Sequence, residues 1–135
     1  MIFRSIRAVF AGLVSIFAIT TAIDMALHAA GVFPPMGEYT SSGPLALAAA
    51  YRLMISTGGC YLAARLAPNR PMLHALVLGG IGLTLSIVGA VVFWGMGPAW
   101  YPLAVIAMAP LCAWAGGQLH EGQARRGVVS LPAAR

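Results

Sequence analysis

The sequence contains no lysine and only three acidic residues, so charged side chains make up 8% of its 135 residues. Apolar residues make up 60%, and the mean hydropathy is +0.86, well above the range of water-soluble globular chains. A soluble domain of this length could not hide so much apolar surface from water. The composition therefore excludes an ordinary soluble fold and favours an integral membrane protein.

The motifs of soluble enzymes are also missing. Without lysine there is no P-loop, and no HExxH, GxSxG or dinucleotide-binding pattern occurs. Cys60 and Cys112 form no CxxC pair and lie in apolar segments, which indicates neither a disulfide framework nor a metal site. The net charge of +5 comes from arginines beside apolar segments, so no nucleic-acid partner is expected. We expect no cofactor, no metal and no soluble-type active site.

Four apolar segments are long enough to cross a bilayer, which takes roughly 20 helical residues. They cover about residues 6–32, 45–66, 72–94 and 100–118. Turns rich in proline and glycine separate them, and Ser42 is expected to cap the second helix. The predicted fold class is all-α: a transmembrane four-helix bundle over residues 1–120, followed by a basic cytoplasmic tail over 121–135. Pro110 predicts a kink in the fourth helix.

The first apolar segment has a second interpretation, as a cleaved signal peptide. Arg4 and Arg7 would form its basic start, and Thr20–Ala22 would form its cleavage site. Helical apolar sequence continues past that site and three further spans follow, so a retained span is favoured.

The arginines outside the spans all flank the same side of the predicted bundle. They are Arg4, Arg7, Arg65, Arg70, Arg125, Arg126 and Arg135, whereas the first and third loops contain none. Short loops that carry Lys or Arg stay in the cytoplasm, which predicts a multi-pass protein of the bacterial inner (plasma) membrane with both termini cytoplasmic. Trp94, Trp100 and Tyr101 cluster at the opposite boundary and are typical of an aromatic interface belt.

Three ionisable residues lie well inside the predicted spans: Asp24, His28 and Arg52. Such residues are costly in a membrane and are therefore the first candidates for a site. The helical rise of 1.5 Å per residue places Asp24 and Arg52 at a common depth, roughly 10 Å below the outer boundary. An ion pair between the first two spans is therefore sterically reasonable.

Helical spacing adds further polar residues to this candidate pocket. Thr21 and His28 share a face with Asp24, and Ser56 follows Arg52 by one turn, with Tyr51 beside it. In one interpretation these residues line an outward-facing pocket, where the acid and imidazole exchange protons or Arg52 holds an anion. In the other they form a polar clamp that fixes helix register. Glu38, in the first loop, is either solvated or closes over the pocket.

Small residues recur at helical spacing on all four spans. Gly59 and Ala63 continue the stripe of Arg52, and both are expected to approach the first span closely. On the opposite face of the first span lies the alanine ridge, defined as Ala18, Ala22, Ala26 and Ala30. It favours a central first span or a homo-oligomer contact, unless it reflects only the alanine-rich composition. Two further stripes predict packing surfaces: Gly82, Ser86 and Ala90, and Cys112, Gly116 and His120.

The two histidines outside the candidate pocket have a common expected location. His74 and His120 lie beside the arginines, and interfacial contacts are expected for them rather than metal binding.

Several runs together resemble a group of short bacterial inner-membrane proteins. They are Asp24-Met-Ala-Leu-His28, Gly31-Val-Phe-Pro-Pro35, Tyr51-Arg52, residues 59–72 and Gly97-Pro-Ala-Trp-Tyr-Pro102. The resemblance covers nearly the whole chain; it implies a four-helix membrane protein and transfers no catalytic residue. Small multidrug exporters look similar in size and helix count, but Asp24 is displaced toward the outer end and a partner Arg52 would oppose binding of a lipophilic cation.

The leading functional hypothesis is a membrane protein that handles a small solute or proton at the outward polar pocket. A second is a non-catalytic accessory or scaffold subunit of a larger membrane complex, and a third is a membrane enzyme acting on lipid or quinone. The expected partners are the lipid bilayer and either a second copy of the chain or a larger complex.

The arginine distribution generates a topology prediction. A reporter that is active only in the cytoplasm, fused after Arg135, is expected to be active in a bacterial host. The same reporter fused within the first loop, after Gly37, is expected to be inactive. Activity of the loop fusion and silence of the terminal one would reverse the assigned orientation.

Overall fold

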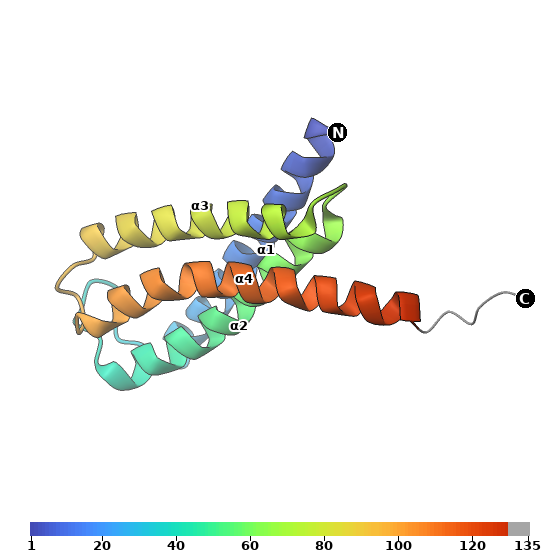
Figure 1. Ribbon diagram of the computed structural model, residues 1–135. Coiled ribbons are helices and arrows are strands. Elements are labelled where there is room, and N and C mark those ends of the chain that lie inside the picture. The colour runs from blue at the N-terminus through green and yellow to red at the C-terminus, as the bar shows by residue number, and fades with distance from the viewer. Residues whose placement is uncertain (130–135) are drawn as a thin grey trace, which may run out of the picture.

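The computed structural model describes residues 1–129, and every regular element there is an α-helix (Figure 1). The helices are α1 (Ile2–Ala29), α2 (Ser42–Leu66), α3 (Pro71–Val92) and α4 (Trp100–Val129). All four are long and apolar enough to cross a membrane. The predicted all-α four-helix bundle is confirmed.

The central helix is α2, which packs against the other three helices. α4 also packs along α3, whereas α1 contacts α2 and a shorter part of α3. Within residues 1–129, α1 does not pack against α4. The expectation of a central first span is therefore wrong, because the small buried residues that allow close approach on several sides lie on α2, at Ala48, Gly59, Cys60, Ala63 and Ala64.

The helix boundaries differ from the expected spans most clearly in α4. This helix passes Pro110 without a break and continues to Val129, so residues 121–129 are helical rather than a separate tail. Contacts with α2 support the continuation, since the Tyr61 hydroxyl donates to Gln123 over 2.6 Å and the Tyr61 ring meets the His120 ring edge-on. Residues 130–135 of the expected tail lie outside the described residues.

The two ends of the bundle differ in composition. The start of α1, the end of α4 and the α2–α3 turn lie at one end (Figure 1), together with the flanking arginines among residues 1–129. At the other end, the two remaining loops are joined by a hydrogen bond from the Thr40 amide to the Met96 carbonyl, 2.9 Å long. Ser41 rather than Ser42 precedes α2, and its side chain makes no cap hydrogen bond. Ser42 instead accepts a hydrogen bond from the Trp100 indole.

The interior is built from glycine and alanine rather than from large side chains. A Cβ placed on Gly116 of α4 would lie 2.7 Å from both the Thr57 carbonyl oxygen and the Tyr61 backbone nitrogen of α2. Gly59 of α2 likewise lies directly against Ile16 of α1. The predicted packing roles of Gly59 and Gly116 are confirmed.

The stripe that begins at Gly82 is different. A Cβ added at Gly82 would have no atom within 4 Å among the described residues. Gly82 therefore does not pack against another helix within residues 1–129, and its part in a packing surface stays a prediction.

Glycine packing generates a matched stability prediction. Gly116→Ala is expected to lower the free energy of unfolding by about 1–3 kcal/mol, because the backbone atoms it would meet cannot move aside without separating α2 from α4. Gly82→Ala is the control, since the same added methyl group meets open space. Unfolding in detergent followed by circular dichroism measures both, and equal effects of the two substitutions would contradict the assignment.

Candidate functional site

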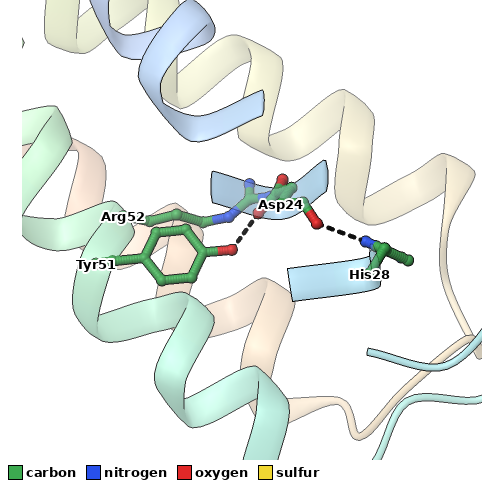
Figure 2. Close-up of polar contacts among 4 residues, drawn as sticks. All are labelled: Asp24, His28, Tyr51 and Arg52. Carbon is green, nitrogen blue, oxygen red and sulfur yellow. Dashed lines mark hydrogen bonds and ion pairs between the residues drawn. The ribbon is translucent and has the colours of Figure 1, made fainter. Parts of the chain in front are cut away.

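Asp24 of α1 and Arg52 of α2 form an ion pair in which Arg52 Nη2 lies 2.7 Å from Asp24 Oδ2. The Tyr51 hydroxyl donates a hydrogen bond to the other carboxylate oxygen, Oδ1 (Figure 2). The predicted cross-helix pair is confirmed, and Tyr51 joins it. We call Asp24, Tyr51 and Arg52 the polar cluster.

The positions of these residues on their helices explain the geometry. Asp24 lies near the loop end of α1, and Tyr51 and Arg52 lie in the half of α2 that follows the same loop. Consecutive residues of a helix point about 100° apart, so Tyr51 and Arg52 approach Asp24 from different directions and reach different oxygens. A planar carboxylate with two oxygens can accept both donors at once.

The polar cluster is not fully enclosed. The side chains of Arg52 and Asp24 are 35% and 27% exposed. Arg52 Nε is nevertheless buried and has no hydrogen-bond partner among the described residues. Tyr101 of α4 lies close enough to interact electrostatically with both charged residues, so a third helix borders the cluster.

His28 does not interact with the carboxylate. Its Nδ1 lies 2.8 Å from the backbone carbonyl oxygen of Asp24, and its ring centroid lies 5.2 Å from that of Phe33 (Figure 2). In a helix, a side chain lies close to the carbonyl group of the residue four positions earlier, and here that acceptor is nearer than the carboxylate. Nδ1 therefore carries the proton that is donated to this carbonyl. The His28 ring is therefore not hydrogen-bonded to the Asp24 carboxylate, as the expected direct proton exchange would require.

Two other candidate residues do not join the polar cluster. Thr21 is exposed and lies in a shallow hollow on the outer face of α1, between Ala18 and Met25. Ser56 is half-buried and makes no side-chain hydrogen bond within residues 1–129. The side chain of Glu38 is exposed and has no ion pair in the same part of the chain, so it does not close over the cluster.

The predicted aromatic belt divides into two parts. Trp94 lies in the turn after α3 and is 60% exposed, and Trp100 is 39% exposed. Tyr101 packs edge-on against Trp100 with a centroid distance of 5.9 Å, but it is also the residue that borders the polar cluster. Sequence reasoning missed this second role, because the position of Tyr101 at a span boundary already explained it.

The two histidines near the arginines behave differently from each other. His74 is only 7% exposed and its Nδ1 lies 3.1 Å from the Arg70 carbonyl oxygen, so the interfacial location expected for it is wrong. Packing of the first turn of α3 into the bundle covers its ring. His120 is half-buried against Tyr61. Within residues 1–129, no three metal-ligating side chains gather.

No family model, curated protein or solved structure matches the chain. The geometry itself shows an acid whose two oxygens are both engaged by donors from the neighbouring helix. Such an arrangement restricts the relative rotation of the two helices and balances the charge of Asp24 with a cation from the neighbouring helix.

The ion pair generates a coupling prediction. Asp24→Asn and Arg52→Gln are each expected to lower the free energy of unfolding by about 2 kcal/mol, since each leaves a charged partner uncompensated in apolar surroundings. The double variant is expected to lose less than the sum of the two. Unfolding in detergent measures all three, with Arg65→Gln at the exposed end of α2 as the control. Additive losses would show that the pair carries no coupling energy.

Proposed function

We propose that the chain is a non-catalytic accessory or scaffold subunit of a membrane assembly, and that the polar cluster fastens α1 to α2. The observation that carries this proposal is the occupation of both Asp24 carboxylate oxygens by donors from the same chain. A cargo at Asp24 would have to share a carboxylate whose two oxygens each already accept a hydrogen bond from α2, which favours a structural role for this acid.

The position of α1 supports a fastening role. This helix has its main contact with α2 and only a small one with α3, so it is held less extensively than α2 or α4. Helices in lipid gain no hydrophobic free energy from association, and a polar contact between them fixes their relative rotation. The hollow on α1 is lined by Val14, Phe17, Ala18, Thr21, Ala22 and Met25. It does not include the polar cluster, so it offers no pocket around Asp24.

The membrane and its orientation belong to the same proposal. We place the chain in the bacterial inner membrane with the arginine-bearing end in the cytoplasm, where short basic segments are retained. The exposed face of α1, which includes the alanine ridge, is then available to another subunit or to a second copy of the chain.

A second candidate function is the handling of a proton or small solute at the polar cluster. It is favoured by the partial exposure of the ion pair and by the buried, unpaired Nε of Arg52. In this alternative the cluster opens during a transport cycle, and Asp24 becomes free for part of the time.

A charge exchange distinguishes the two functions. Asp24→Arg alone is expected to place two cations side by side and to lower both the unfolding midpoint and the yield of the native assembly in mild detergent. Asp24→Arg combined with Arg52→Asp restores opposite charges and is expected to recover both. Blue-native electrophoresis of the tagged chain, extracted from its own host, measures the assembly.

Proton entry into proteoliposomes tests the alternative transport function. Chain reconstituted with an internal pH-sensitive dye is expected to admit protons no faster than protein-free liposomes under an imposed gradient. Proton entry that requires the chain and disappears in Asp24→Asn, with the fold intact by circular dichroism, would overturn the accessory role and assign the transport function.

A further inference from the structure

The arginine-bearing end of the bundle carries cations that have no ion-pair partner within residues 1–129. Within residues 1–129 these are Arg4, Arg7, Arg65, Arg70, Arg125 and Arg126. None of them makes an ion pair or a side-chain hydrogen bond in that part of the chain, where the one ion pair is between Arg52 and Asp24. Glu121 is the one acidic residue on this side of the described structure. This end of the described structure therefore has a large excess of positive charge, which favours contact with anions.

Two of these arginines come together from different elements. The Asn69 amide donates to Met1 Sδ over 3.7 Å, so the start of α1 lies against the α2–α3 turn. Arg4 is in the first turn of α1, and Arg70 directly follows Asn69. We call this place the basic corner, defined by Arg4, Asn69 and Arg70.

The helix directions add to the positive potential of the basic corner. Both α1 and α3 begin here, and neither has an acidic residue in its first turn or a side-chain cap hydrogen bond. The start of a helix is the positive end of its dipole, where a cationic side chain is unfavourable and an anion is favourable. Arg70 lies at the N-cap of α3 with φ of 45°, a backbone conformation that residues other than glycine rarely adopt. Glycine would adopt this φ more readily than arginine, so the backbone conformation does not explain why arginine occupies this position.

Exposed apolar side chains surround the same corner. Ile2, Phe3 and Ile6 of α1 are 75%, 83% and 58% exposed. A free inorganic anion would satisfy the arginines and leave these side chains in contact with water. A lipid provides a phosphate for the arginines and acyl chains for the apolar residues, and the end of a bundle of spanning helices is the level at which headgroups lie.

We propose that the basic corner binds the headgroup phosphate of an anionic phospholipid of the leaflet at the arginine-bearing end. Arg4 and Arg70 contact the phosphate, and Ile6, which follows Arg4 toward the hydrocarbon layer, contacts the acyl chains. The proposal depends on the chain being in a membrane and does not depend on the accessory role, since it concerns the opposite end of the bundle from the polar cluster.

Native mass spectrometry of the full chain in mild detergent tests the proposal. Phosphatidylglycerol and phosphatidylcholine with the same acyl chains are offered in equal amounts, and the chain is expected to retain phosphatidylglycerol preferentially. Arg4→Gln combined with Arg70→Gly is expected to reduce that preference by about fivefold per arginine removed. The glycine suits the φ of 45° at this position, so helical content and thermal midpoint are expected to be maintained. Arg126→Gln near the far end of α4 is the matched control and is expected to leave the preference unchanged.

Five results would overturn the proposal. Equal retention of the two lipids by the unmodified chain would show that headgroup charge is not recognised. An unchanged preference in the double variant, or the same loss in Arg126→Gln, would show that the basic corner is not the site. Displacement of phosphatidylglycerol by millimolar inorganic phosphate would assign the corner to a soluble anion instead. If the double variant does not fold, a phosphatidylglycerol preference of the unmodified chain that is identical in 0.05 and 1 M NaCl would also overturn it, since contacts between exposed charges are screened by salt.

Discussion

The close approach of α2 to α1 and α4 is the constraint on which the rest of the structure depends. Gly116 leaves space for the backbone of α2 and Gly59 for the Ile16 side chain of α1, and an added Cβ at either position would collide with these atoms. Helices surrounded by lipid associate through such van der Waals contacts, because lipid tails are as apolar as the side chains they would replace. The bundle therefore obtains its cohesion from positions that have no side chain at all.

Glycine contacts set the distance between two helices but leave their rotation and sliding weakly defined. The polar cluster supplies what these contacts lack, because a guanidinium and a phenol can reach the two oxygens of one carboxylate in few relative orientations. Gly12 and Gly59 meet farther along the same pair of helices, on the side toward the chain ends. Together the two contacts determine how α1 lies on α2.

The sequence predicts the features that depend on a single helix, and those that depend on how deep a residue lies within its predicted span. Span length and composition give the four helices, and equal depth gives the Asp24–Arg52 pair. Helical spacing places Thr21 and His28 on one face, but it does not say which part of that face α2 covers or that the Asp24 carbonyl is the nearer partner of His28. The burial of His74 and the approach of Tyr101 to the polar cluster likewise depend on how neighbouring helices cross, which span boundaries do not determine.

The length of α4 has a mechanical consequence. Its 30 residues extend about 45 Å, whereas the hydrocarbon layer is about 30 Å thick. The part of α4 beyond the α2–α3 turn projects past the rest of the bundle (Figure 1). The hydrogen bond between Tyr61 and Gln123 ties the base of this projection to α2. Because α4 is continuous to Val129, a rotation of α2 would be transmitted through this hydrogen bond to the projecting end of α4.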